Sequence, residues 1–340
     1  MNEVKKPSMK RRSNHHDYQE RRMYMITMEV SNRQPLLGRL TGELTAERGS
    51  GEEPRIVLTE LGSAVEREWF GIPRYYPQIE VMGLQIMPDH LHGILFVHED
   101  IPKHLSHVIT GFKTGCNRAK KRIEGRLATE PQSTHNSMPP GSLRVAAPSQ
   151  QSSVPFQPLF APGYNDLILR NYEEFQRWKN YLADNPRRLM MKRNNPEWLR
   201  PFFHYQKGSY VYNGVGNRNL LLASDRLSVR ISRRLTDEQL KSEIERYLSA
   251  AKAGAVLISP AISKGEKMVM RQAFDSHLPT IVIMENGFTP LSKPHGEQFY
   301  ACAEGRLLML SAWEHHNEKK PLTAYMCQQM NLMALELSKL

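Results

Sequence analysis

The stretch MPDHLHG, residues 87–93, joins two apolar runs, 81–87 and 94–97, and it decides how this part of the chain folds. Apolar runs that flank a turn around PDHL predict two neighbouring β-strands. His90 and His92 lie at alternate positions, so both imidazoles point to one face of a strand, roughly 6–7 Å apart. A lone histidine in an apolar run is usually a core or edge residue, but a pair can converge on one divalent ion. Because other metal hydrolases and structural sites share this spacing, the pair predicts only half of a metal site.

Length and composition predict a protein of two domains. The chain has 340 residues, of which 40% are hydrophobic and 24% charged, which is typical of globular proteins. No run of about 18 apolar residues is long enough to span a bilayer, and the first residues contain no apolar segment typical of a secretory signal. We therefore expect a cytoplasmic protein. Three cysteines, Cys116, Cys302 and Cys327, are too far apart for a cysteine zinc site and are expected to be ordinary thiols.

Positive charge is concentrated in one part of the chain. The net charge is +11, and residues 101–200 contain 16 lysines and arginines but only seven aspartates and glutamates. Nine of the eleven net charges therefore fall in less than a third of the sequence. Such a basic stretch is expected where phosphates of a nucleic acid are held. A solvated helix face followed by a basic loop would give the same count, so charge alone leaves both interpretations open.

The first half of the chain predicts an α+β domain over residues 23–200, preceded by a basic tail, 1–22. The expected order is β, α, β, β, α, β, α, which indicates a ferredoxin-like antiparallel sheet with helices on one side. Residues 127–158 are rich in Ser, Pro and Gln and almost uncharged, so we expect a flexible insertion there. A helix is expected from 172 to 184, where Pro186 ends it.

The helix over 172–184 contains candidates for the missing part of the metal site. Tyr181 and Asn185 are four residues apart and therefore share one helix face, with Asn185 at the predicted helix end. The alternative is a buried tyrosine followed by an ordinary Asn-Pro helix stop. Without the histidine pair we would favour that alternative.

Four separate elements, in this order, resemble one known family. They are the QPLLGRL turn, MPDHLHG, the helix LSHVITGFKTGCNRAKKR, and GYNDLILRNYEEFQRWKNYLADNP. Together they are similar to the IS200-type single-tyrosine transposases, which are HUH enzymes, and particularly to the branch associated with repetitive extragenic palindromes. The resemblance covers about residues 20–200.

The resemblance implies a site and a reaction. It implies that His90 and His92 bind a divalent metal, Mg²⁺ or Mn²⁺, that Tyr181 attacks DNA, and that Asn185 completes the metal site. A phenol has a pKa near 10 and needs assistance to attack at neutral pH, which a cation on the scissile phosphate would give. The product would be a 5′-phosphotyrosine and a free 3′-OH. One tyrosine cuts one strand at a time, which suggests single-stranded or hairpin DNA as the partner of a monomer or homodimer.

Basic and aromatic residues around these elements are candidate DNA contacts. The candidate phosphate-binding residues are Lys113, Arg118, Lys120, Lys121 and Arg122 near the end of the first long helix, and Arg187 and Arg188 after the tyrosine helix. Basic residues also simply solvate the last turn of a helix. Tyr75, Tyr76 and Trp69 could stack on bases or belong to the core.

The second half, residues 201–340, alternates strand-like and helix-like segments, which predicts a parallel α/β sheet of the Rossmann-like type. AVLISPAISKGEKMVMRQAF followed by LPTIVIMENGF resembles the Rossmann-like domain of the DNA-processing protein A family. Loops at the carboxyl ends of parallel strands can hold phosphates. The candidate residues in two such loops are Ser232, Arg233, Ser259, Lys264 and Gly265. A structural or DNA-holding role is an equal alternative to nucleotide binding.

The sequence is therefore compatible with three functions. The first is a metal-dependent enzyme that nicks single-stranded DNA and transfers the strand through a phosphotyrosine. The second is a catalytically inactive DNA-binding protein derived from such an enzyme, which needs the basic surface but not Tyr181. The third is a metal-dependent hydrolase that uses His90, His92 and a water nucleophile.

Overall fold

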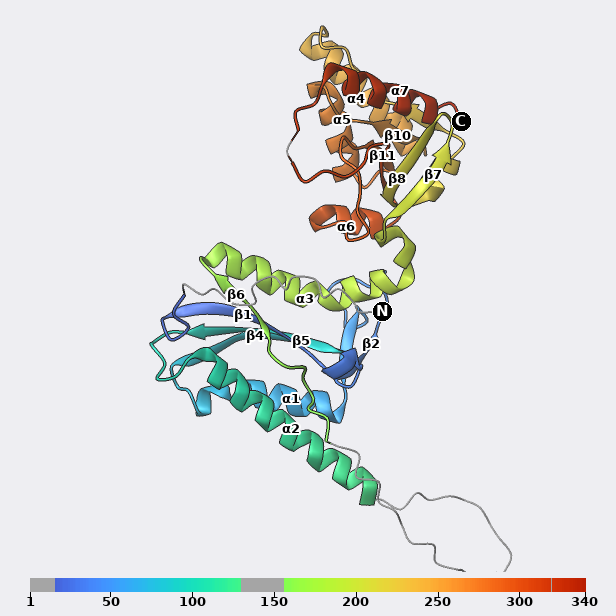
Figure 1. Ribbon diagram of the computed structural model, residues 1–340. Coiled ribbons are helices and arrows are strands. Elements are labelled where there is room, and N and C mark those ends of the chain that lie inside the picture. The colour runs from blue at the N-terminus through green and yellow to red at the C-terminus, as the bar shows by residue number, and fades with distance from the viewer. Residues whose placement is uncertain (1–15, 130–155, 319) are drawn as a thin grey trace, which may run out of the picture. The chain divides into compact units, whose positions relative to one another are not determined.

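The computed structural model describes residues 16–129, 156–318 and 320–340 (Figure 1). The chain divides into two compact units, Met1–Met190 and Met191–Leu340, here called the N-terminal and C-terminal units. The division lies before the predicted boundary at residue 200. The reason is that Trp198 packs with the C-terminal unit. Its indole lies against Gly305, where a Cβ added to the glycine would be 2.8 Å from the ring.

Among the described residues, the N-terminal unit contains a four-stranded antiparallel sheet in the order β4-β5-β1-β6. The sheet strands are β1 (Arg22–Glu29), β4 (Ile79–Met87), β5 (His90–Val97) and β6 (Asn165–Leu169). A separate hairpin pairs β2 (Gly38–Thr41) with β3 (Arg55–Leu58). The antiparallel sheet predicted from sequence is confirmed. The turn between β4 and β5 is shorter than predicted, because His90 already pairs with Met87 as part of the strand.

Helices cover both faces of this sheet, which corrects the prediction that all of them lie on one side. Helices α1 (Glu60–Phe70) and α2 (Leu105–Thr129) pack on one face, and α3 (Tyr172–Asn194) lies across the other (Figure 1). Alternate residues of each strand point to opposite faces. In β5, Leu91 and Leu95 therefore join the core under α1 and α2, whereas Ile94 packs with Leu182 of α3.

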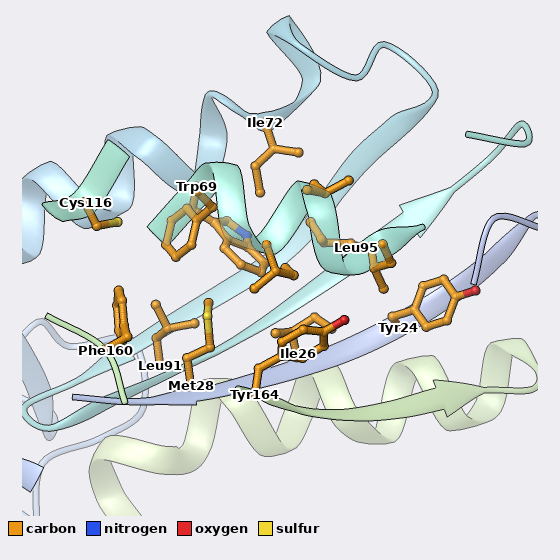
Figure 2. Close-up of a cluster of buried hydrophobic side chains, with 14 of the residues drawn as sticks. Tyr24, Ile26, Met28, Trp69, Ile72, Leu91, Leu95, Cys116, Phe160 and Tyr164 are labelled. Atoms are coloured by element: carbon orange, nitrogen blue, oxygen red, sulfur yellow. The ribbon is translucent and has the colours of Figure 1, made fainter. Parts of the chain in front are cut away.

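Gly93, the last residue of MPDHLHG, permits a close contact between a helix and the sheet in this core. The indole of Trp69 in α1 is fully buried and lies directly on the β5 backbone at Gly93, where a Cβ would overlap the ring. Figure 2 shows Trp69 and Cys116 on the helices facing Leu91 and Met28 on the strands. Glycine is therefore required here by packing, since its lack of a side chain is what admits the indole.

Part of the predicted tail, 1–22, belongs to the folded N-terminal unit. Residues 1–15 lie outside the described residues, but Tyr18 is buried in the core of the N-terminal unit. Its hydroxyl donates a hydrogen bond of 2.8 Å to Asp166 in β6, and its ring stacks on Tyr24 of β1. The prediction was wrong for residues 16–22 because a tertiary contact with β6, far away in sequence, orders a segment that has no periodicity of its own.

The predicted insertion, 127–158, lies mostly outside the described residues. Residues 127–129 form the last turn of α2, and the described chain resumes at residue 156. From there to β6 the backbone is held by side chains of α2. Lys113 donates to the carbonyls of Ala161, at 2.7 Å, and Gly163, while Asn117 accepts from the backbone N–H of Leu159. Helix α2 thus binds the segment 156–164, which leads to β6, through side chains on successive helical turns.

In the described part of the C-terminal unit, six strands form a mixed sheet in the order β7-β8-β12-β11-β10-β9. The parallel strands are β9 (Arg226–Ser228), β10 (Val256–Ser259), β11 (Thr280–Ile283) and β12 (Leu307–Ser311). An antiparallel hairpin, β7 (Phe202–Lys207) and β8 (Tyr210–Gly216), extends the β12 edge. The sequence predicted the parallel part but missed the hairpin, whose strands FFHYQK and YVYNGVG mix apolar, aromatic and polar residues without regular alternation.

Helices lie on both faces of the second sheet. Helices α4 (Asp237–Lys252) and α5 (Lys264–Asp275) pack on one face, and α7 (Ala324–Leu337) packs on the other. Helix α6 (Gly296–Ala303) connects β11 to β12. The sequence did not predict α6, because it is a short helix that follows a segment rich in Gly and Pro. The alternation of strands and helices that predicted a parallel sheet is otherwise confirmed.

No helix within the described ranges has the length and apolar character needed to cross a bilayer. The cysteines are free thiols, as expected. Burial raises the pKa of the Cys116 and Cys302 thiols, so both stay protonated near neutral pH.

The contact between Gly93 and Trp69 makes a prediction about stability. Gly93→Ala is expected to lower the free energy of unfolding by about 1–3 kcal/mol, because the new methyl must displace a buried indole. Urea denaturation followed by circular dichroism measures the change. In Gly111→Ala, a matched substitution in α2 where an added Cβ meets open space, stability should rise by about 0.5–1 kcal/mol. A Gly93→Ala protein as stable as wild type would contradict this account.

Candidate active site

His90 and His92 lie side by side on the face of the sheet that α3 covers. Both belong to β5, and their ring centroids are 4.9 Å apart with the ring planes nearly perpendicular. Cross-strand neighbours in β1 are Glu29 for His90 and Thr27 for His92. The alternation expected from HLH is therefore present, and Leu91 between the histidines points into the core on the opposite face.

Each imidazole is oriented by a hydrogen bond at Nδ1. His90 donates from Nδ1 to the Asp89 carboxylate at 2.6 Å, and a 2.8 Å bond joins His92 Nδ1 to the hydroxyl of Thr27. A carboxylate only accepts, so the proton of a neutral His90 is on Nδ1 and its Nε2 carries the lone pair. Metal-binding histidines are commonly held in this way by a partner at the other ring nitrogen. The candidate ligand atom of each imidazole is Nε2.

Asp89 is itself held in its charged form. Burial alone would raise the pKa of the Asp89 carboxyl, but the hydrogen bond from His90 and the positive charge of Arg33 lower it below its usual value. The Arg33 guanidinium lies 3.4 Å from Asp89 and also pairs with Glu29. Arg33 has a left-handed backbone, with φ of 55°. A turn at the end of β1 thus places an arginine beside both carboxylates next to His90.

Helix α3 continues through Pro186 to Asn194, so the prediction that it ends at 184 was wrong. A proline inside a helix removes one backbone donor and is tolerated where tertiary contacts compensate. Two such contacts come from the loop between β2 and β3. Arg187 donates to the carbonyls of Leu44 and Ala46, at 2.7 and 3.1 Å, and Arg48 pairs with the buried Asp184 at 2.9 Å.

Tyr181 lies on α3 beside the histidines. Its ring centroid is 6.2 Å from that of His92, and the two rings meet edge to face. The ring is also flanked by Trp178, at 5.2 Å between centroids, and by the guanidinium of Arg188, which lies 5.4 Å above the ring centroid. The structure thus brings the ring of Tyr181 next to that of His92 within one chain.

Asn185, one turn beyond Tyr181, lies within the helix rather than at its end. It is buried, 7% exposed, and its Nδ2 has no hydrogen-bond partner. Turning the carboxamide by 180° would place Oδ1 at that position, where an oxygen ligand would suit Mg²⁺ or Mn²⁺. No group of three or more His, Cys, Asp or Glu side chains that could hold a metal occurs in the described part of the chain. The candidate donors among the predicted residues are the two imidazoles on β5 and the carboxamide of Asn185 on α3.

The predicted DNA contacts on α2 lie on the opposite side of the sheet from the histidines, and part of them bind the protein itself. Lys113 donates to a backbone carbonyl of the segment 156–164, and Lys120 donates to the carbonyl of Gln157. Lys120 and Lys121 also lie over the ring of Phe156. Arg118 and Arg122 are exposed. Of the two arginines predicted on α3, Arg187 binds the loop after β2 and Arg188 faces Tyr181.

The three candidate stacking aromatics have different environments. Trp69 is fully buried in the core, which decides the alternative that the sequence left open for it. Tyr75 is 81% exposed, and it lines a hollow between α1 and α2 together with the half-buried Tyr76 and with Arg118.

The candidate phosphate-binding residues of the C-terminal unit do not form one exposed loop. Ser232 and Arg233 are exposed before α4, and Lys264 is exposed at the start of α5. Ser259 is fully buried and accepts from the backbone N–H of Ala261, whereas Gly265 packs on Ile231. At the N-terminus of α5, the carboxylate of Glu266 accepts from the N–H groups of Ile262 and Ser263. A carboxylate of the chain thus occupies donors that a phosphate would use.

Sequence reasoning missed the residues that orient the site. Thr27 and Arg33 are far from MPDHLHG in sequence, and only the pairing of β1 with β5 brings them to the histidines. Asp89 could have been found, because a carboxylate directly before a histidine at the start of a strand is a common orienting partner. Trp178, three residues before Tyr181, could have been found from helical spacing.

Comparisons with known proteins show only remote similarity. No protein-family model matches the sequence. An uncharacterized protein of Haemophilus influenzae is 30% identical over 90 residues, which is 26% of this chain and 44% of that protein. The chain therefore matches less than half the length of this relative.

Three solved structures are similar to parts of the chain. A REP-associated tyrosine transposase bound to a REP hairpin is 13% identical over 52% of this chain and 72% of its own, with a TM-score of 0.30. DNA processing protein A from Helicobacter pylori is 20% identical over 38% of this chain and 57% of its own, at 0.28. A candidate transposase from Deinococcus radiodurans is 16% identical over 51% of this chain and 97% of its own, at 0.24. Because these TM-scores are below 0.5, the function has to be argued from the site itself.

The orientation of His90 makes a prediction about metal binding. Asp89→Asn is expected to weaken Mn²⁺ binding by about 10–100-fold, because the amide no longer fixes the proton on Nδ1. Calorimetric titration of the whole protein with Mn²⁺ measures the affinity. Glu99→Gln, an exposed change just beyond β5, should leave the affinity unchanged. Equal affinities for Asp89→Asn and wild type would contradict the orienting role of Asp89.

Substitution of Lys113 tests whether this lysine stabilises the fold or binds DNA. Lys113→Met is expected to lower the free energy of unfolding by about 1–3 kcal/mol, because two backbone carbonyls lose a charged donor. Arg122→Met, on the exposed side of the same helix, should change it by less than about 0.5 kcal/mol. Thermal and urea denaturation provide the comparison. A stable Lys113→Met protein that binds DNA weakly would instead support the sequence-based assignment.

Proposed function

We propose that this protein is a metal-dependent enzyme that nicks single-stranded DNA and transfers the strand through a 5′-phosphotyrosine intermediate, as DNA transposases do. The observation that carries the proposal is the approach of Tyr181 to the histidine pair, with 6.2 Å between the rings of Tyr181 and His92. Tyr181 is half-buried, and its ring meets the imidazole of His92, whose Nδ1 is hydrogen-bonded to Thr27. In this proposal the N-terminal unit is a ferredoxin-like catalytic domain and the C-terminal unit a Rossmann-like domain.

The reaction assigns the nucleophile to Tyr181. Its phenolic oxygen attacks the scissile phosphorus, loses its proton, and forms an O–P bond while the bond from phosphorus to the 3′ oxygen breaks. The leaving oxygen takes up a proton and becomes a free 3′-OH. Because the phosphotyrosine conserves the energy of the broken bond, a 3′-OH can later attack it in reverse and release the phenol. Strand transfer then needs no nucleotide cofactor.

The other residues of the site hold the reacting groups. His90, His92 and Asn185 would hold Mg²⁺ or Mn²⁺, and Asp89 and Thr27 orient the imidazoles. A bound divalent cation would neutralise charge that develops on the phosphate. Helix α3 provides both the nucleophile and the amide, so the packing of this helix on the sheet sets their distance from β5.

The substrate proposed is single-stranded or hairpin DNA. A single nucleophilic tyrosine cleaves one strand at a time, and the chain carries a net charge of +11 with which to hold phosphates. Arg188 lies at the site, whereas Arg118 and Arg122 are exposed on the far side of the sheet. Contacts there would hold DNA beyond the cleaved position.

A covalent-adduct assay tests the proposal. Whole protein is incubated with Mg²⁺ or Mn²⁺ and a labelled single-stranded DNA library that contains hairpins, and is then denatured. Wild type should form an adduct that survives denaturation, and Tyr181→Phe should lose it. Tyr172→Phe, which alters an exposed tyrosine on the same helix, should keep it. The double variant His90→Ala, His92→Ala should bind DNA but form no adduct.

The other two functions give different results in the same assay. DNA binding without cleavage by wild type would indicate a catalytically inactive DNA-binding protein. Cleavage without an adduct, and unaffected by Tyr181→Phe, would indicate a hydrolase that uses water. Either result would overturn the proposed mechanism.

A further inference from the structure

We propose that Arg188 is a positioning residue for the nucleophile, which holds the Tyr181 ring against the histidine pair rather than acting only as a contact for DNA phosphates. This inference rests on the proposed function of Tyr181. It concerns a role that neither the composition of the basic stretch nor its sequence spacing assigned to Arg188.

The ring of Tyr181 is enclosed by three different groups. Trp178 meets it edge on, with the ring planes at 80°, and His92 meets it edge on at 73°. The guanidinium of Arg188 lies 5.4 Å above the ring centroid. An arginine at this distance is attracted to the face of an aromatic ring. Together these three groups restrict the position of the ring.

Helical geometry explains how Arg188 reaches the ring. Residues 181 and 188 are seven apart, which is two turns, so both lie on one face of α3. This alignment exists only because α3 continues through Pro186. Had the helix ended at residue 184, as the sequence predicted, the arginine would not lie above the tyrosine in this register.

Neighbouring Arg187 shows that the two adjacent arginines are used differently. Arg187 donates to two backbone carbonyls of the loop after β2, and therefore fixes the helix. Arg188 points toward the nucleophile. In the free protein its guanidinium lies over the ring of Tyr181.

A positioning role should affect the rate of the chemical step more than DNA binding. With saturating hairpin DNA and Mg²⁺, Arg188→Gln is expected to slow single-turnover adduct formation by about 10–100-fold, the cost of a misplaced reacting group. The DNA concentration at half-maximal rate should change much less. Arg188→Lys, which keeps the charge but not the planar group, should restore part of the rate. Arg177→Gln, a change at an exposed arginine of the same helix, should leave the rate unchanged.

A second measurement does not depend on catalysis. Whole protein with 3-fluorotyrosine at position 181 should give a ¹⁹F resonance that shifts and broadens in Arg188→Gln but not in Arg177→Gln. Melting temperatures confirm that each variant is folded. If wild type forms no adduct, the proposed function fails while the ¹⁹F comparison still tests the contact. An unchanged resonance, or a loss of DNA affinity with an unchanged rate at saturation, would overturn the positioning role.

Discussion

The structure of the N-terminal unit depends on one constraint, the alternation of side chains along β5. Leu91, Gly93 and Leu95 point to the core under α1 and α2, where Gly93 admits the indole of Trp69. His90 and His92 consequently point to the other face. A shift of one residue in strand pairing would exchange the two faces and bury both imidazoles beneath α1 and α2. The same packing that stabilises the core therefore places the candidate metal ligands.

Helix α3 completes the site because it is the element that covers the second face. It contributes Leu182 to the packing on the sheet, Tyr181 to the histidines, and Asn185 one turn further along. Its position is set at two points by the loop between β2 and β3, through Arg48 and Arg187. These bonds hold α3 at Asp184 and Arg187, on either side of Pro186, so the helix stays continuous through the site.

The positive charge of residues 101–200 is divided among different tasks. Lys113 and Lys120 bind carbonyl groups of the segment that leads to β6, so these two lysines of the basic stretch stabilise the fold. Arg188 lies at the site, and Arg118 and Arg122 stay exposed. A count of charges cannot separate these tasks, because a lysine paired with a backbone carbonyl has the same sequence signature as one that holds a phosphate.

By itself, the sequence determined the antiparallel sheet of the N-terminal unit, the parallel strands of the C-terminal unit, the shared face of His90 and His92, and the helix that carries Tyr181. These features follow from local periodicity, since strands repeat every two residues and helices every 3.6. Only the tertiary structure decided that α3 lies opposite α1 and α2, that it continues past Pro186, and that Tyr18, Thr27 and Arg33 belong to the core or the site. These outcomes depend on contacts between residues far apart in sequence, whose energies no local pattern contains.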